Sequence, residues 1–199
     1  MVKIGFIVEG ESETILLKSG SFQNWCRTEG IEVVTPVVNA GGGGGLLPEF
    51  FANYEKRLSM AGQPDKIVVL TDREKAPTNA VVQKRILSVN KNRKKNIDYV
   101  FVSVKALEAW FLADDNAMSS WLKERFHEEY PERTQGTPWD RIKEISMSKS
   151  RGPGHNHLAF AKTIINSHGF SLERAAQHPN CPSVKEFHDK LKEWGAGNS

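Results

Sequence analysis

Short runs of apolar, mostly β-branched residues alternate with segments of helical periodicity along the first half of the chain. Four of these runs predict β-strands, at Lys3–Val8, Ile31–Val38, Lys66–Thr71 and Ile97–Val104. The first and the third are apolar throughout after a leading lysine. Continuous apolarity is typical of strands that are covered on both faces, as in a parallel sheet.

Between these strands the apolar positions recur with the period of an α-helix. Helices are predicted at Thr14–Trp25, Leu47–Leu58 and Asn79–Val89, and Gly62 and Pro64 end the second of them. Strands that alternate with helices in this way build a doubly wound α/β fold. We therefore expect a mostly parallel, Rossmann-like sheet flanked by helices.

After Val104 the strand pattern stops and only helical segments follow. Residues 130–156 are rich in Pro, Gly, Ser and Thr, which predicts a loop with at most a short helix inside it. We expect an α/β core over residues 1–115 and a helical extension over residues 116–199 that packs on it. The helices expected in this half are 107–112, 118–126, 139–145, 158–165 and 184–194.

The composition excludes several classes of protein. The chain has 199 residues, of which 39% are hydrophobic and 26% charged, as in an ordinary globular protein. Two cysteines, Cys26 and Cys181, are too few for a disulfide framework and match no zinc-binding spacing. The apolar stretch at the N-terminus is too short for a signal peptide, and no window holds the roughly 18 apolar residues of a membrane helix. A reducing, cytoplasmic environment is the simplest expectation.

Acidic residues follow two of the predicted strands. Glu9 comes directly after the first strand, and Asp72 and Glu74 come at the end of the third. The carboxyl ends of parallel strands meet at one edge of the sheet, where ligands bind. Carboxylates that converge there repel one another, and an all-oxygen set of ligands suits Mg²⁺ or Mn²⁺. An acidic residue at one strand end has little meaning, but two in this order favour a metal site.

Other acidic and glycine-rich features have structural explanations. Glu11 and Glu13 open a predicted helix, where negative charge is favourable, and Ser12 is a candidate for its N-cap. The five glycines Gly41–Gly45 precede a helix but lack the Gly-Lys-Ser/Thr of a phosphate-binding loop. We interpret them as a turn that lets backbone or substrate approach closely.

The basic residues are clustered, although the net charge is only +3. A local cationic patch suits phosphate groups, since each contact releases counterions. The alternative interpretation is a solvated loop before a strand. The candidates for contacts with a nucleic-acid backbone are Lys91, Arg93, Lys94 and Lys95, together with Lys149 and Arg151.

The strand-ending segments VEGESE (residues 8–13) and TDRE (71–74) resemble the two motifs of the Toprim domain. That pattern is a glutamate and a glycine after the first strand, then Asp-x-Asp after a later strand. Here Glu9 and Gly10 match the first motif, while Glu74 replaces the last aspartate of the second. The chain is also similar to small Toprim-like proteins of the DUF4276 type, through VEGESE and the segment LEAWFLAD (107–114).

The resemblance implies a metal-dependent nuclease that cleaves phosphodiester bonds of DNA or RNA. Glu9, Asp72 and Glu74 would be its catalytic residues and ligands of Mg²⁺ or Mn²⁺, with Glu108 as a supporting ligand, while Asp114 would cap structure. Toprim nucleases of the OLD type work with an ABC-type ATPase, so the resemblance also implies an ATPase partner in an anti-phage defence system. The alternative is a non-catalytic Toprim-like module that docks onto such a partner.

Overall fold

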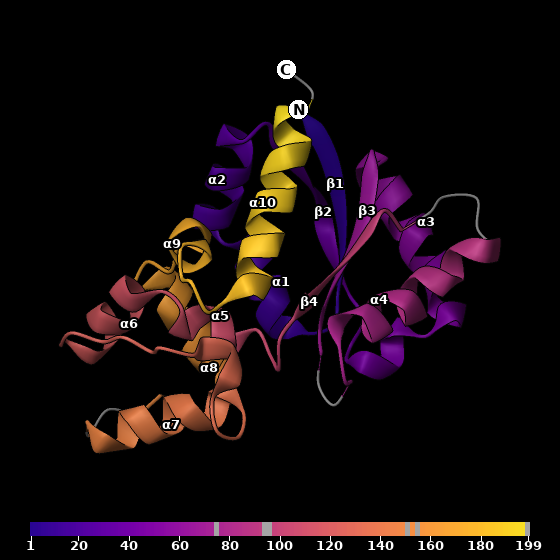
Figure 1. Ribbon diagram of the computed structural model, residues 1–199. Helices are drawn as coiled ribbons and strands as arrows, with labels where there is room; N and C mark the ends of the chain where they lie inside the picture. The colour runs from indigo at the N-terminus through magenta and orange to yellow at the C-terminus, as the bar shows by residue number, and fades with distance from the viewer. Residues whose placement is uncertain (74–75, 93–96, 150–151, 154–155, 198–199) are drawn as a thin grey trace.

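The centre of the molecule is one four-stranded parallel sheet (Figure 1). The structure is a computed structural model that describes residues 1–73, 76–92, 97–149, 152–153 and 156–197. The strands lie in the order β2-β1-β3-β4. Their bounds lie close to those predicted from the sequence: β1 Val2–Val8, β2 Ile31–Asn39, β3 Lys66–Asp72 and β4 Tyr99–Ser103.

Helices connect the strands and make up the C-terminal half of the chain, as the periodicity predicts. The α/β fold class is therefore confirmed. Within the α/β half the α-helices are α1 Glu11–Lys18, α2 Gly20–Thr28, α3 Phe51–Gly62 and α4 Asn79–Leu87, with short 3-10 helices η1 Gly43–Leu46, η2 Pro48–Phe50 and η3 Ser88–Asn92. After β4 come α5 Glu108–Leu112, α6 Asp115–Leu122, η4 Pro131–Arg133, α7 Pro138–Ser148, α8 His157–Asn166, α9 Leu172–Ala176 and α10 Pro182–Ala196.

The first connection contains two helices where the sequence predicts one. The break lies at Ser19, whose hydroxyl donates a hydrogen bond to the carbonyl of Leu16 at 2.7 Å. The same oxygen accepts from the backbone N–H of Phe22 at 3.3 Å and so caps α2. A serine inside a continuous periodic pattern therefore ends one helix and starts the next. The prediction of one helix over 14–25 is wrong for this local reason.

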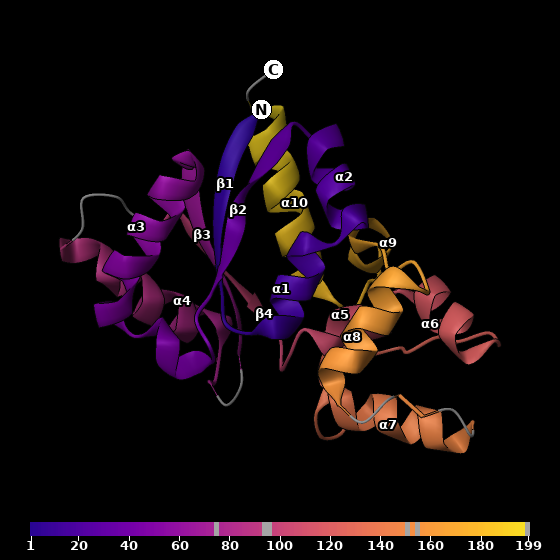
Figure 2. The ribbon, with the colours of Figure 1, turned by 180° about the vertical axis from the view of Figure 1, so that it is seen from behind.

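Helices cover both faces of the sheet (Figures 1 and 2). α3 and α4 pack on one face, where Phe51, Leu58 and Ile86 contact apolar strand residues. α1, α2 and α10 pack on the other face, around Phe6 and Phe101. Apolar side chains of these helices cover both faces of the sheet, which explains why the central strands are apolar throughout and do not alternate with polar residues.

The C-terminal helices share a core with the α/β half. The ring of Phe187 in α10 lies 4.8 Å from that of Phe101 in β4 and 6.1 Å from that of Phe22 in α2. It also lies 5.1 Å from the ring of Trp110 in α5. One hydrophobic cluster therefore includes residues of the α/β half and of the helices that follow β4.

Replacing Phe187 by alanine should lower the free energy of unfolding by about 3–5 kcal/mol, because the side chain is 0% exposed and leaves a cavity. Equilibrium unfolding in urea measures the change. Met60→Ala is the control, since Met60 is 80% exposed and its truncation should change stability by less than about 0.5 kcal/mol. A loss below about 1 kcal/mol for Phe187→Ala would show that α10 does not close this face of the sheet.

Candidate active site

The two acidic strand ends meet at the centre of the sheet. β1 and β3 are neighbours, and from them the chain winds outward to β2 on one side and β4 on the other. Ligands of doubly wound folds bind at such a switch point, beyond the carboxyl ends of the strands. The structure brings Glu9 and Asp72 together there, since the backbone N–H of Asp72 donates to Glu9 Oε2 at 3.1 Å.

Each of these two carboxylates is oriented by a neighbouring hydroxyl. Thr71 donates its hydroxyl hydrogen bond to Glu9 Oε2, and Ser103 at the end of β4 donates to Asp72 Oδ1. The Glu9 backbone N–H continues the ladder, with a bond to the Leu70 carbonyl at 3.0 Å. Each carboxylate is therefore held by a hydroxyl group of the neighbouring strand.

Glu108, from the helical half of the chain, lines the same cavity as Glu9 and Asp72. It is the first residue of α5, and its side chain is buried. Burial raises the pKa of its carboxyl, and the nearby His157 ring, whose Nδ1 lies 3.8 Å from Glu108 Oε1, opposes the rise. The expectation that Glu108 faces the acidic edge agrees with this position. Asp114 instead caps α6, where its Oδ1 accepts from the Ala117 N–H at 3.2 Å.

A fourth carboxylate, Glu13, belongs to the same cluster, although its place at the start of a predicted helix indicates a structural role. It is only 4% exposed, and its Oε2 accepts a hydrogen bond from the N–H of Gly10 at 3.1 Å. Gly10, not Ser12, is the N-cap of α1, so Glu13 is the third helical residue and turns back toward the strand end. A capping pattern counted from Gly10 would have placed Glu13 beside Glu9.

Neighbouring carboxylates raise the pKa values of two members of the cluster, Glu13 and Asp72. Burial raises the pKa of Glu13 to about 7, with further contributions from the charges of Glu108 and Glu9. The pKa of Asp72 is raised well above its ordinary value by burial and then by the charge of Glu13, while the Ser103 hydrogen bond opposes the rise. Repulsion of this kind is the condition that a bound cation relieves.

The cluster lines a cavity of about 470 Å³ whose far wall comes from the helical half. That wall includes Thr137, Trp139 and His157. Thr137 starts α7 by a reciprocal cap, in which its Oγ1 accepts from the Asp140 N–H at 3.0 Å and Asp140 Oδ2 accepts from its N–H at 3.1 Å. This cap starts α7 at Pro138, one residue before the helix predicted inside the loop, and α7 continues to Ser148, three residues beyond it.

The glycine-rich segment approaches the site with its backbone. Gly41 and Gly42 have φ of +75° and +109°, which favour glycine, and the Gly42 N–H donates to the Glu9 carbonyl at 2.7 Å. A Cβ atom on Gly45 would overlap the carbonyl oxygen of Ala40. The glycines therefore permit a close approach of the chain, and Gly42 forms part of the cavity wall.

Two arginines that are not among the predicted contacts with the nucleic-acid backbone lie beside the carboxylates. Arg73 and Arg85 line a second cavity of about 400 Å³, which Glu9 and Asp72 also line. The Nε of Arg73 is buried and has no hydrogen-bond partner among the described residues. A buried donor without a partner next to paired carboxylates suits an anionic group that enters from outside.

The predicted cationic residues that the structure describes lie away from this edge. Lys91 is in η3, where Asn90 bonds both to the N–H and to the carbonyl of Ile97 just before β4, at the amino edge of the sheet. The length of β3, from Lys66 to Asp72 at about 3.3 Å per residue, separates that edge from Asp72 by roughly 20 Å. Lys149 follows the last residue of α7, and its Nζ lies 2.7 Å from Glu124 Oε1. Outside the described residues are Glu74, Arg93, Lys94, Lys95 and Arg151.

The carboxylates of this cavity do not surround one ion by themselves. In the described part of the chain, only Asp115, His127 and His178 offer three candidate ligand atoms mutually within 4.8 Å. An ion at the acidic cavity would therefore take few direct protein ligands and complete its shell with water, as Mg²⁺ usually does. The oxygen-only donors fit that ion and Mn²⁺.

No helix within the described ranges is long and apolar enough to cross a membrane. Family models, curated proteins and solved structures were compared with the chain, and none of them matches it.

Proposed function

We propose that this protein is a Mg²⁺- or Mn²⁺-dependent nuclease that hydrolyses phosphodiester bonds. The observation that carries the proposal is the group of four converging carboxylates, Glu9, Glu13, Asp72 and Glu108, at the switch point of a parallel sheet. Three of them have raised pKa values, and for Glu13 and Asp72 the neighbouring carboxylates contribute to the rise. The resemblance of the strand-ending motifs to Toprim nucleases supports the same reaction.

The residues of the cavity divide into two groups by their chemistry. Glu9 and Asp72 would hold a divalent ion, with Glu13 and Glu108 as supporting ligands; an ion bound there polarises a phosphoryl oxygen and favours ionisation of water. Glu13, with a pKa of about 7, can exchange a proton at neutral pH. Arg73 and Arg85 lie where they can contact the phosphates of the substrate.

Cleavage assays test this proposal. Labelled DNA and total tRNA would be incubated with the protein and Mg²⁺ or Mn²⁺, in parallel with Glu9→Gln and Asp72→Asn. Products that require the metal and disappear in both variants would support the nuclease and identify its substrate. Absence of cleavage together with absence of metal binding would reject it and favour a non-catalytic interaction module.

We further propose, on the resemblance alone, that an ATPase encoded beside this protein controls its activity in an anti-phage defence system. The sequence contains no Gly-Lys-Ser/Thr phosphate-binding loop of its own. The cleavage assays would be repeated with that ATPase, with and without ATP. Cleavage that is unchanged by the ATPase would contradict this part of the proposal.

Replacing Arg85 by alanine should weaken binding of nucleic acid. The slope of log K against the logarithm of the salt concentration should become smaller by about 1, because one phosphate contact is lost. Arg85 is exposed and lines the cavity beside Glu9 and Asp72, so it can neutralise a substrate phosphate without a structural role. Fluorescence anisotropy at several salt concentrations measures both quantities. Lys91→Ala is the matched control, and its binding should equal that of the wild type. Weaker binding by Lys91→Ala, with binding by Arg85→Ala unchanged, would place the nucleic acid at the amino edge of the sheet.

A further inference from the structure

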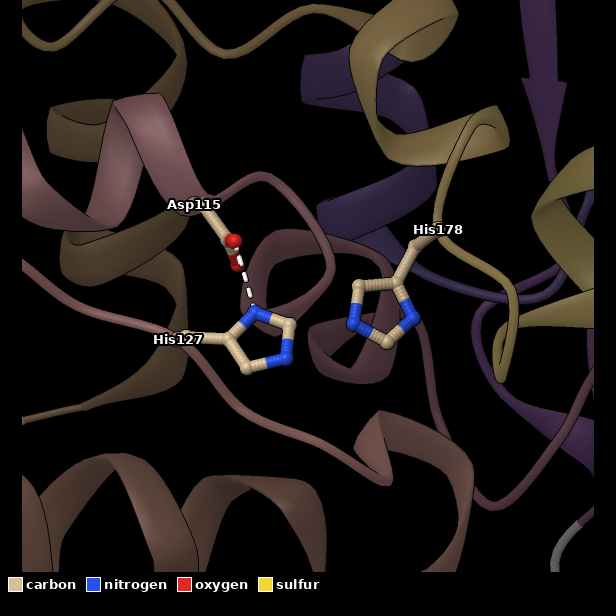
Figure 3. Close-up of side chains that lie close together, drawn as sticks. All are labelled: Asp115, His127 and His178. Atoms are coloured by element: carbon tan, nitrogen blue, oxygen red, sulfur yellow. Dashed lines mark hydrogen bonds and ion pairs between the residues drawn. The ribbon is translucent and has the colours of Figure 1, made fainter.

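A second cluster of metal-ligating side chains lies in the helical half, apart from the acidic cavity. Asp115 is the first residue of α6, His127 follows α6 and His178 follows α9 (Figure 3). They line a cavity of about 250 Å³ that shares no lining residue with the 470 Å³ acidic cavity. Three segments distant in sequence thus direct two imidazoles and a carboxylate toward one another.

The three side chains are already in contact. His127 Nδ1 lies 2.7 Å from Asp115 Oδ2. The two imidazole rings are stacked, with centroids 5.4 Å apart and planes inclined by 27°. One candidate ligand atom from each residue lies within 4.8 Å of the other two. Bonds of about 2.0–2.1 Å to a tetrahedral ion would need these atoms about 3.4 Å apart. His127, whose side chain is 54% exposed, has the freedom to close this gap.

Two atoms of the cluster are buried and have no hydrogen-bond partner within the described chain. They are His178 Nε2 and Asp115 Oδ1. His178 is only 7% exposed, and its Nε2 points toward His127 in Figure 3. Buried polar atoms are nearly always satisfied, so two such atoms in one cluster indicate a ligand between them.

We propose that Asp115, His127 and His178 form a second metal site, which binds a divalent transition-metal ion of the Zn²⁺ type. Two imidazoles and one carboxylate are a ligand set that Zn²⁺ accepts and that Mg²⁺ does not prefer. The ion would replace the hydrogen bond between His127 Nδ1 and Asp115 Oδ2, and a proton on Nδ1 would move to Nε2 or be released to solvent. The adjoining cavity leaves a fourth position for water or another ligand.

The surrounding charges are compatible with a cation. Arg174 lines the same cavity, but its guanidinium is paired with Asp114, at 2.9 Å from Oδ1 and 2.8 Å from Oδ2. The pair of Arg174 and Asp114 also holds the start of α6, and with it Asp115, in place.

Metal binding has a specific consequence for the loop that carries His178. The Nδ1 of His178 accepts a hydrogen bond from the Asn180 N–H at 3.2 Å, so in the neutral ring the proton is on Nε2. An ion bound to Nε2 moves that proton to Nδ1 and breaks the bond from Asn180. The backbone amide resonance of Asn180 therefore reports directly on ligation by His178.

The test is a titration of the full chain with Zn²⁺ or Co²⁺ in excess Mg²⁺. Calorimetry measures the affinity and stoichiometry, visible absorption detects bound Co²⁺, and NMR detects changes at backbone amides. We expect one equivalent to bind, visible Co²⁺ bands and a shift of the Asn180 amide. His127→Ala and Asp115→Asn, at partly exposed positions, should each weaken binding at least about 10-fold while the far-UV circular dichroism stays unchanged.

Two control variants separate this site from other metal-binding groups. His168→Ala removes a histidine that contacts Ser120 outside the cluster, and Asp72→Asn alters the acidic cavity; both should bind Zn²⁺ as the wild type does. Failure of the wild type to bind, or equal affinity in wild type and His127→Ala, would overturn the proposal. Zn²⁺ binding lost in Asp72→Asn but kept in His127→Ala would assign the ion to the acidic cavity instead.

Discussion

Replacing Asp72 by asparagine should abolish binding of Mn²⁺ and, with it, the proposed cleavage, while making the metal-free protein more stable. The substitution keeps the shape of the side chain and the oxygen that accepts the Ser103 hydrogen bond. It removes a buried carboxyl group, whose pKa is raised by burial and by the charge of Glu13. Without that buried carboxylate, the free energy of unfolding of the metal-free protein should rise.

Differential scanning fluorimetry with and without Mn²⁺ measures both effects for Asp72→Asn. The wild type should gain thermal stability from Mn²⁺, and the variant should start higher and lack the part of the gain that comes from the acidic cavity. Ser103→Ala is the matched control, because it removes the hydrogen bond that orients Asp72 but leaves the charge. It should bind Mn²⁺ more weakly without the gain in stability. A less stable Asp72→Asn variant would show that the carboxylate is structural.

The metal-free protein should lose stability as the pH rises from about 4.5 to about 7. Burial raises the pKa of Glu13 from 4.5 to about 7, so the folded state holds a proton in this range that the unfolded state has released. Stability falls with pH wherever the folded state binds more protons, and the contribution of Glu13 is on the order of 3 kcal/mol. The raised pKa values of Asp72 and Glu108 act in the same direction.

Urea unfolding at pH 5 and pH 7.5 measures this loss, with Glu13→Gln as the control. Glutamine keeps an oxygen that can accept the Gly10 N–H, but it does not titrate. The stability difference between the two pH values should therefore be smaller in the variant by the contribution of Glu13. Saturating Mg²⁺ should also reduce the loss in the wild type. Equal pH profiles for the wild type and Glu13→Gln would show that Glu13 titrates normally.

The sequence predicts the fold and the centre of the site because both depend on local patterns. The apolar runs before Glu9 and Asp72 indicate buried parallel strands, and the residue after a strand of this kind lies at the ligand-binding edge. Glu108 also follows from the chain order, since it comes shortly after the fourth strand.

The remaining parts of the site depend on packing that is not local. Glu13 has the position of an ordinary helix-opening acid, and only the walls of the cavity bury it. Arg85 reaches the site because α4 lies against the sheet beside Asp72. Lys91 belongs to a dense basic run, yet it precedes β4 and so lies at the opposite edge. The pairing of His127 with His178 requires the packing of α5, α6 and α9, which the sequence pattern does not reveal.

The most direct test of the acidic site is the anomalous scattering of Mn²⁺ in crystals of the wild-type protein. We expect a peak in the 470 Å³ cavity, within bonding distance of the Glu9 and Asp72 carboxylates, with water completing the shell. The peak should be missing in crystals of Asp72→Asn grown in the same conditions. An empty cavity in the wild type, at Mn²⁺ concentrations that saturate known Mn²⁺ sites, would contradict a metal-dependent reaction at this edge of the sheet.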